Sequence, residues 1–192
     1  MEVQDLVMDK QFLPEIIHGE TVTLKKHQVE LADKMYRYVV EDRQRLARFL
    51  PWPDFIATVH DEVDFINNCS EEWQKYATFS FGIFRNSDSE YMGNLSAFGI
   101  NWKNCSCELG YWILGKFEGQ GHISSAVRLL EATLFGMGFN RIVIRCDPKN
   151  LRSASVPKRL HYVFEGVQRE VSFRNDGFHD LSVYSKLKSD YP

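Results

Sequence analysis

The sequence predicts an α+β protein built on a mixed, mostly antiparallel and twisted sheet flanked by helices. Strand patterns separated by a short polar turn at 77–100 indicate antiparallel pairing. A strand, a helix and a second strand over 106–146 indicate one parallel crossover. A hairpin pattern follows at 163–187. A single crossover embedded in antiparallel pairs is typical of the α+β class.

The N-terminal part of the chain is predicted to be mainly helical. Alternation over 21–26 indicates one strand, and apolar spacing then indicates a helix from 29 to 39. A second, short helix is expected at 42–49 and a third at 59–76. Pro51-Trp52-Pro53 separates these last two helices, because proline restricts both its own backbone and that of the residue before it.

The rest of the chain is predicted to hold most of the sheet and its main helix. Apolar residues recur at helical spacing most regularly over 121–138, and a buried strand follows at 139–146. The other predicted elements are strands at 77–85, 91–100 and 106–114, a short helix after Asn150, and hairpin strands at 163–173 and 179–187 that turn at Asn175-Asp176-Gly177.

The composition predicts one globular domain over residues 1–192. The apolar share of 44% and the charged share of 26% are ordinary for a globular protein of this length. We expect neither a secretory signal nor the ~20 consecutive apolar residues of a membrane span, and therefore a cytoplasmic protein. The four cysteines are expected to be reduced thiols rather than metal ligands.

Charge is distributed unevenly along the chain, although the net charge is only −3. Residues 41–72 carry eight acids against three arginines, whereas residues 141–174 carry eight basic residues against three acids. The first segment could attract a cationic group and the second a polyanion. Ordinary solvated surface would have the same composition, so charge alone does not decide. We expect neither a nucleic-acid nor a membrane partner.

The most specific local feature is the pair Gly119 and Gly121, between a predicted strand and the helix at 121–138. Without Cβ atoms, the backbone there can approach a ligand closely. The unpaired N–H groups of a first helical turn favour an anion, and Lys116 adds a positive charge. A Walker loop is absent, and Ser124 replaces the third glycine of a Rossmann fingerprint. A tight turn without a ligand is the alternative.

Lys116-x-x-Gly119-x-Gly121 resembles the Gln/Arg-x-x-Gly-x-Gly/Ala signature of the GNAT N-acetyltransferases, whose backbone amides hold the pyrophosphate of coenzyme A. The resemblance covers residues from about 20 to 188 and extends to the subgroup that acetylates the N-terminal serine or alanine of ribosomal proteins. The further segments that carry it are Arg45 to Trp52, Glu108-Leu-Gly-Tyr-Trp-Ile, Asp147-Pro-Lys-Asn150-Leu-Arg-Ser153, Glu165-Gly and His179-Asp180…Tyr184-Ser185.

The resemblance implies transfer of an acetyl group from acetyl-coenzyme A to an amine by direct attack. The implied acceptor is the N-terminal α-amine of a protein such as a ribosomal protein. A backbone N–H near Ile113 would polarise the thioester carbonyl, and no metal would be needed. The residues implied in binding acetyl-coenzyme A are Trp112, Ile113, Leu114, Lys116, Gly119, Gln120, Gly121, His122, Ile123, Ser124, Asn150, Ser153 and Arg159.

Two residues are candidates for proton transfer. In the subgroup, a serine three residues after the asparagine lies near the sulfur, so the resemblance implies that Ser153 is the acid; a structural hydroxyl at a helix start is the alternative. Glu108 is the candidate base, with Glu41 or a water molecule as rivals. Asn150 either caps the helix that follows it or bonds the pantetheine arm.

Several positions depart from the family pattern. Lysine stands at residue 116, Ser124-Ser125 replaces Thr-Glu, and His161-Tyr162 replaces Gly-Phe. Pro157 stands where many GNAT enzymes carry a tyrosine acid, and it should kink its helix. The departures leave open a catalytically idle module that binds coenzyme A. An acetyltransferase for small amines (polyamine, aminoglycoside or amino acid) is the other alternative, and the sequence is compatible with a monomer or a homodimer.

Overall fold

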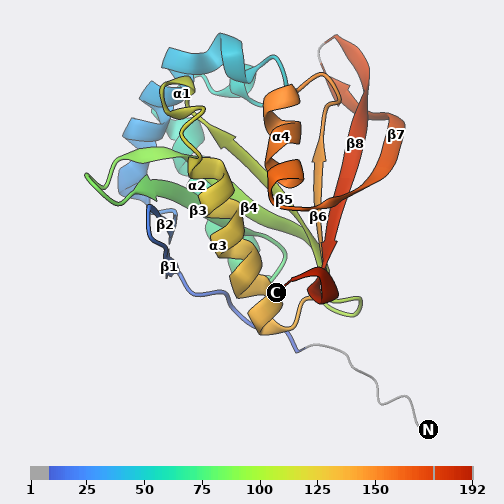
Figure 1. Cartoon of the computed structure of the whole chain (residues 1–192). Coiled ribbons are helices and arrows are strands. Elements are labelled where there is room, and N and C mark those ends of the chain that lie inside the picture. The colour runs from blue at the N-terminus through green and yellow to red at the C-terminus, as the bar shows by residue number, and fades with distance from the viewer. Residues whose placement is uncertain (1–8, 175, 192) are drawn as a thin grey trace, which may run out of the picture.

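The computed structural model describes residues 9–174 and 176–191, and eight strands within them form one sheet (Figure 1). The strands are β1 (Ile16–His18), β2 (Val22–Lys26), β3 (Phe79–Arg85), β4 (Tyr91–Asn101), β5 (Ser106–Ile113), β6 (Arg141–Cys146), β7 (Val163–Arg174) and β8 (Gly177–Leu187). Their order across the sheet is β1-β2-β3-β4-β5-β6-β8-β7. Among these strands only β5 and β6 pair in parallel. The predicted α+β class with a single crossover is confirmed.

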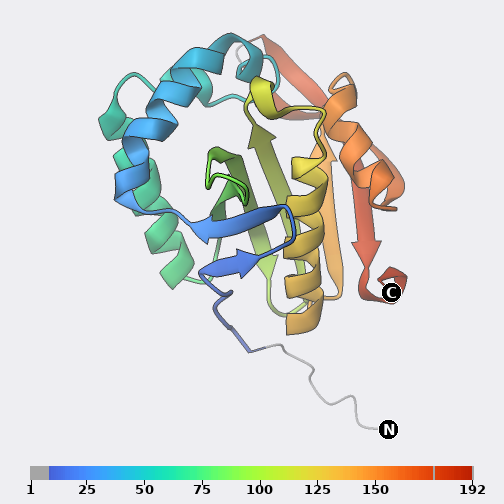
Figure 2. The ribbon, with the colours of Figure 1, turned by 60° about the vertical axis from the view of Figure 1, so that its left-hand side comes forward.

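Four α-helices in the described residues cover the two faces of the sheet (Figures 1 and 2). They are α1 (Ala32–Leu46), α2 (Val59–Gln74), α3 (His122–Met137) and α4 (Leu151–Arg159). α1 and α2 pack against each other on one face, and α3 and α4 lie on the other. α3 buries the apolar side that its periodicity predicts, including Ala126, Leu130 and Leu134.

The structure differs from the prediction in the N-terminal part. The helices predicted at 29–39 and 42–49 are one helix, α1, which follows a short 3-10 turn. Met35 and Leu46 are both buried, because one apolar stripe continues through the expected break. β1 was not predicted, since its three residues are held by pairing with β2 and not by a pattern of their own.

The predicted C-terminal hairpin is confirmed as β7 and β8, which extend beyond the rest of the sheet (Figure 1). The register between them shifts twice, at Phe164/Gly166 and at Gln168/Ser172. Such irregularities bend a strand and increase its local twist. Of the predicted turn, Asn175 lies outside the described residues, and Gly177 has a positive φ of 122°. The tip of this hairpin lies beside the connection between α1 and α2 (Figure 1).

A buried polar cluster lies between β2 and β4. His27 Nε2 is 2.9 Å from Asn94 Oδ1, which also accepts a hydrogen bond of 2.7 Å from the Tyr91 hydroxyl. Among the described residues, His27 Nδ1 has no hydrogen-bond partner. Burial lowers the pKa of His27 to about 4, against the opposing effect of the bond to Asn94. The folded protein therefore holds this imidazole neutral.

This neutral histidine should make the fold sensitive to acid. Because the pKa of His27 is lowered on folding, the unfolded chain binds a proton between pH 6.5 and about 4 that the folded chain does not. Stability should fall over that window by about 3 kcal/mol, at about 1.4 kcal/mol per pKa unit. In His27→Gln, which keeps a donor for Asn94 but does not titrate, this loss should be absent. Urea unfolding at each pH measures both proteins.

A second titrating group, Glu62, changes the pH dependence of stability in the opposite direction, so its contribution has to be subtracted. Burial raises the pKa of Glu62 to about 7, so its contribution to stability grows as the pH falls. Glu62 is present in both proteins, and the difference between their unfolding curves isolates His27. Parallel pH profiles for the wild type and His27→Gln would contradict the assignment.

Candidate active site

The site is built where β5 and β6 separate. Their pairing runs from Ser106↔Arg141 to Leu109↔Ile144 and goes no further within the described strands. β5 continues to Ile113 paired only with β4, and α4 lies across the gap in Figure 1. The Leu114 N–H bonds to the Met92 carbonyl in β4 at 3.0 Å. Because successive backbone amides of a strand point to opposite sides, the Ile113 N–H points into the opening.

A glycine loop follows β5 and leads into α3. Gly119 has φ +74° and Gly121, the N-cap of α3, has φ +82°. A Cβ atom at either position would meet no atom of the described chain within 4 Å. The backbone is therefore left-handed and bordered by open space, as a ligand-binding loop requires. The first backbone amides of α3 belong to His122 and the residues that follow it. The His122 ring nitrogen Nε2 lies 3.3 Å from Gln120 Oε1.

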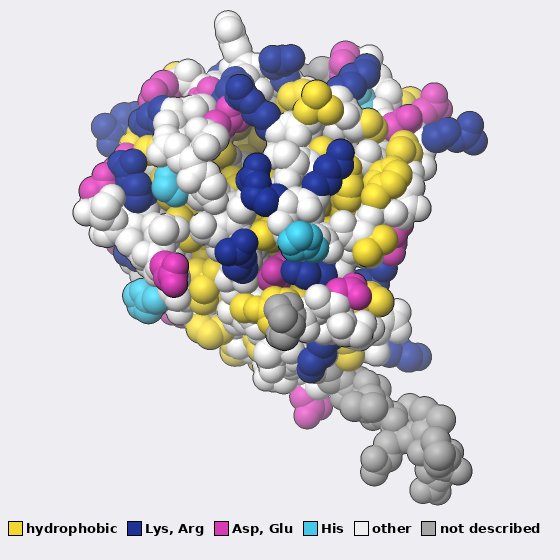
Figure 3. Space-filling model, in the orientation of Figure 1, with side chains coloured by type: hydrophobic (Ala, Val, Ile, Leu, Met, Phe, Trp, Pro, Cys, Tyr) yellow, Lys and Arg dark blue, Asp and Glu magenta, His cyan; other side chains and the backbone are white. Residues whose placement is uncertain are grey.

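Basic side chains surround this loop. Lys116 is partly exposed, with its Nζ 4.0 Å from the centre of the Tyr38 ring and 3.8 Å from Glu41. The Arg85 guanidinium lies 5.2 Å from the Phe117 ring centre. Burial lowers the pKa of His122, and the charge of Arg85 lowers it further. Lys and Arg side chains are also visible across the face that α3 and α4 form (Figure 3). The surroundings of the loop therefore suit an anion.

Ion pairs connect the loop to α1 and α4. Arg45 of α1 donates to Asp42, to Glu118 at 2.6 Å and to the Ile113 carbonyl at 2.6 Å. The Gly115 N–H donates to Asp42 at 2.8 Å. From α4, Arg152 contacts the second oxygen of Glu118. Three separate segments are thereby held together at one edge of the opening. Sequence reasoning singled out neither Glu118 nor Arg152.

The two predicted catalytic residues lie on opposite faces of the sheet. Glu108 and Tyr111 are three positions apart in β5, so their side chains project in opposite directions. Tyr111 reaches Ser153 on α4, whereas Glu108 accepts a hydrogen bond of 2.8 Å from Arg145 Nε. The structure therefore does not bring Ser153 and Glu108 together, and it gives Glu108 an ion-pair partner that the sequence did not reveal.

The implied cofactor residues on α3 and α4 have specific local roles. Asn150 caps α4, since its side-chain oxygen accepts from the Ser153 N–H at 3.1 Å. Arg159 donates to the Ser124 hydroxyl at 2.8 Å and so ties α4 to α3. Ile123 is half-buried against the core. These contacts position the helices beside the opening.

Two other implied cofactor residues can offer only their backbone to the opening. Trp112 points to the α1/α2 face, where its ring centre lies 5.6 Å from that of Trp52 and 6.2 Å from that of Tyr91. The Leu114 side chain is buried in the core. The resemblance implied that both residues bind acetyl-coenzyme A, and this role stays a prediction for their backbone groups.

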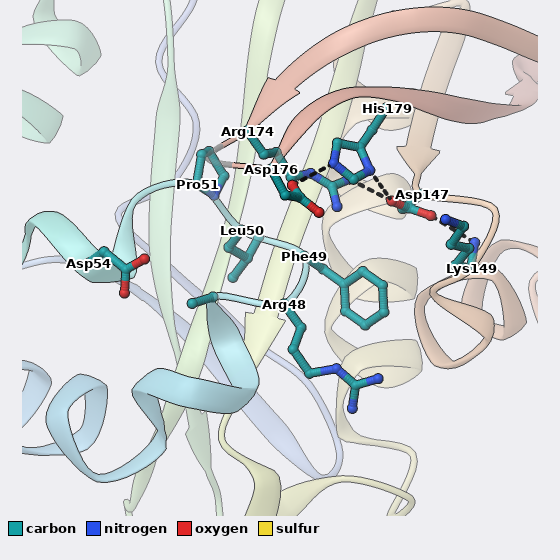
Figure 4. Close-up of a pocket in the computed structure, with 11 residues that line it drawn as sticks. Arg48, Phe49, Leu50, Pro51, Asp54, Asp147, Lys149, Arg174, Asp176 and His179 are labelled. Atoms are coloured by element: carbon teal, nitrogen blue, oxygen red, sulfur yellow. Dashed lines mark hydrogen bonds and ion pairs between the residues drawn. The ribbon is translucent and has the colours of Figure 1, made fainter.

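A cavity of about 480 Å³ lies where the α1–α2 connection meets the end of β6 and the hairpin tip (Figure 4). Asp147 is buried there and bonds Arg174 Nη2 at 2.8 Å, with His179 Nδ1 at 3.4 Å. His179 Nε2 in turn lies 2.7 Å from Asp176. The lining residues are Ala47, Arg48, Phe49, Leu50, Pro51, Asp54, Asp147, Lys149, Arg174, Asp176 and His179.

The acid-rich segment at 41–72 does not form this cavity as its composition suggested. Of its acids, Asp54 is the one among the lining residues. Asp42 bonds Arg45, Glu41 lies beside Lys116 at the glycine loop, and Asp61 caps the start of α2. These three acids therefore have partners close in sequence or in space, and the composition of the segment alone did not decide between a cation-attracting surface and ordinary solvated surface.

The chain matches the family model described as "Acetyltransferase (GNAT) domain" over residues 21–163. It therefore belongs to the GNAT acetyltransferases, the class that its mixed sheet, strand separation and glycine loop also indicate. The chain is an N-acetyltransferase that uses acetyl-coenzyme A as its acetyl donor. None of the helices in the described parts of the chain has the length and hydropathy of a membrane span.

Individual relatives agree with this assignment. The chain is 28% identical over 154 residues to the ribosomal-protein-serine acetyltransferase of Escherichia coli, covering 80% of this chain and 85% of that one. It is similar to the structure of a ribosomal L7/L12 alpha-N-protein acetyltransferase in complex with coenzyme A, with a TM-score of 0.86, 25% identity and coverage of 92% and 99%. A microcin C7 self immunity acetyltransferase shares the fold, with a TM-score of 0.84, 24% identity and coverage of 88% and 93%.

The glycine loop yields a direct test of cofactor binding. Asparagine tolerates left-handed backbone better than other residues with a side chain, so Gly121→Asn should fold while its Cβ fills the space beside the loop. We expect the dissociation constant of coenzyme A, measured by calorimetry, to rise at least about tenfold, equivalent to about 1.4 kcal/mol. Gly99→Asn, with φ +59° and equally open space, is the matched control. Equal affinities of both variants would remove the loop from the cofactor site.

Proposed function

We propose that this protein acetylates the α-amine at the N-terminus of a protein, such as a ribosomal protein. The observation that carries the proposal is the cavity at the end of β6, which lies on the α1–α2 side of the separated strands and has room for a chain end. The E. coli relative is named for acetylating serine in ribosomal proteins, and the coenzyme A complex belongs to an enzyme named for the same kind of acceptor.

The charges that line the cavity favour a peptide over a polycation. The charged lining residues are Arg48, Lys149 and Arg174 against Asp54, Asp147 and Asp176, together with His179. This balance provides no excess negative charge to hold a polyamine or an aminoglycoside. Phe49, Leu50 and Pro51 add apolar and backbone surface suited to the first residues of a chain.

Acetyl-coenzyme A supplies the acetyl group as a thioester, and the residues around the glycine loop fit its charged end. The left-handed Gly119 and Gly121, with open space beside both, suit a pyrophosphate held by backbone amides. Lys116, Arg85 and Arg152 would supply positive charge around it. The opening between β5 and β6 is where the pantetheine arm would pass.

Three groups of this chain are assigned to the chemistry. The Ile113 N–H, directed into the opening, would polarise the carbonyl under attack. Ser153, at the first turn of α4, would protonate the leaving thiolate. Glu108 has one oxygen bonded to Arg145, and its other oxygen would accept the proton of the amine directly or through water. An α-amine has a pKa of about 8, so it needs only modest help to become neutral.

The role of Ser153 can be tested by removing its hydroxyl. Ser153→Ala should lower kcat by roughly 10- to 10⁴-fold while KM for acetyl-coenzyme A stays within a few-fold, because only the transition state loses an interaction. The control is Ser155→Ala, two residues further along α4, whose hydroxyl bonds only the Arg152 carbonyl among the described residues. Steady-state thiol release measures both. A rise in KM with kcat preserved would make Ser153 a binding residue.

The acceptor can be tested with matched peptides. Peptides with a free N-terminal Ser or Ala should be acetylated faster near pH 8 than the same peptides blocked at the N-terminus but carrying a lysine, whose amine holds its proton to about pH 10.4. Tandem mass spectrometry should locate the new acetyl group on the first residue. Faster turnover of a polyamine or an aminoglycoside than of every peptide would overturn the proposed acceptor and leave the acetyltransferase assignment intact.

A further inference from the structure

α4 contains a proline and yet runs without interruption from Leu151 to Arg159. Proline has no backbone N–H, so Pro157 cannot donate to the carbonyl four residues before it. That carbonyl belongs to Ser153, the residue proposed above as the proton donor. A helix carbonyl left without a donor in a half-buried position is unfavourable. The arrangement around Ser153 must therefore include another donor.

Tyr111 supplies it from the neighbouring strand. Its hydroxyl donates to the Ser153 carbonyl at 3.1 Å, in place of the missing amide. The same oxygen lies 3.5 Å from Ser153 Oγ and is placed to accept from it. One phenol therefore contacts both the backbone and the side chain of this serine. The tyrosine in β5 thus supplies the hydrogen bond to the Ser153 carbonyl that the proline in α4 cannot make.

We propose that Tyr111 is a positioning residue for the acetyl-transfer reaction and holds the Ser153 hydroxyl at the opening between β5 and β6. The inference rests on the proposed role of Ser153. A serine hydroxyl near the start of a helix otherwise turns to bond backbone groups of its own helix. The contact with Tyr111 opposes that turn, and the bond to the Ser153 carbonyl fixes the phenol at the same time. At 3.5 Å the contact is weak, so the Ser153 proton can leave Tyr111 for the sulfur when the thiolate forms.

The surroundings of Tyr111 keep it in the form that this role requires. Burial raises the pKa of the Tyr111 phenol, so it keeps its proton and stays a donor to the carbonyl. Burial also raises the pKa of the Cys146 thiol at the end of β6, with Ser153 acting in the opposite direction. The group in contact with the Ser153 hydroxyl is therefore neutral.

A double-mutant comparison with Pro157 tests the contact itself. Tyr111→Phe should lower the melting temperature by roughly 5 °C, because the Ser153 carbonyl loses its donor. In a Pro157→Ala background, the restored N–H of residue 157 can bond that carbonyl, so the same change should cost less than half as much. Equal losses in both backgrounds would overturn the assignment of Tyr111 as the substitute donor. This measurement does not depend on activity.

A second comparison tests whether Tyr111 acts through Ser153. Tyr111→Phe should lower kcat roughly tenfold with KM for acetyl-coenzyme A within a few-fold, and should cause no further loss in a Ser153→Ala background. Tyr36→Phe, which removes another 3.1 Å bond from a phenol to a backbone carbonyl, is the control and should leave kcat unchanged. Unchanged kcat in Tyr111→Phe, or full additivity with Ser153→Ala, would overturn positioning. If Ser153→Ala itself kept full kcat, the proposed acid would fail while the stability comparison still stood.

Discussion

The separation of β5 from β6 is the constraint on which the rest of this structure depends. Parallel strands stay together only while they share hydrogen bonds, and these two stop sharing them after Leu109↔Ile144. The freed backbone groups require other partners or a ligand. Arg45 donates to the Ile113 carbonyl, one of these freed groups. The same break in the ladder that costs sheet hydrogen bonds therefore creates the opening to which we assign the reaction.

Charged contacts hold the edges of this opening in place before any ligand binds. Glu118 lies between Arg45 and Arg152 and so connects α1, the glycine loop and α4. Such a link is strongest where the side chains are partly shielded from water, as Glu118 is. The glycine loop thus has a carboxylate of its own, which pairs with two arginines. Order in the loop comes from these contacts and not from the loop sequence alone.

Local patterns made much of the fold predictable. The periodicity of 121–138 predicted α3, and alternation predicted β3, β4 and β5. β1 was missed because three residues carry no period and owe their conformation to β2. The false break in α1 came from ending the first apolar stripe at Val39, although Leu46 continues it.

The candidate site was predictable only where its residues are neighbours in sequence. Gly119 and Gly121 form a local motif, and their left-handed backbone follows from it. The partners of Glu108 and Ser153 come from other elements, and no spacing rule predicts that Arg145 or Tyr111 will meet them. The sequence predicted a kink at Pro157, but α4 runs uninterrupted from Leu151 to Arg159, because the hydroxyl that replaces the missing amide stands 46 positions earlier in the chain.

The hairpin β7–β8 shows how this architecture can diversify. Its tip forms one wall of the cavity at the end of β6, the proposed acceptor site, and is anchored by the ion pair between Arg174 and Asp147, whereas the glycine loop and Ser153 belong to other segments. The register shift at Gln168/Ser172 lies between that tip and the part of β8 that pairs with β6. The tip can therefore change length or sequence while the β6–β8 pairing and the contact between Gln168 and Arg145 stay in place. Under the proposed function, this chain architecture would gain new acceptors by remodelling that tip alone, with the glycine loop unchanged.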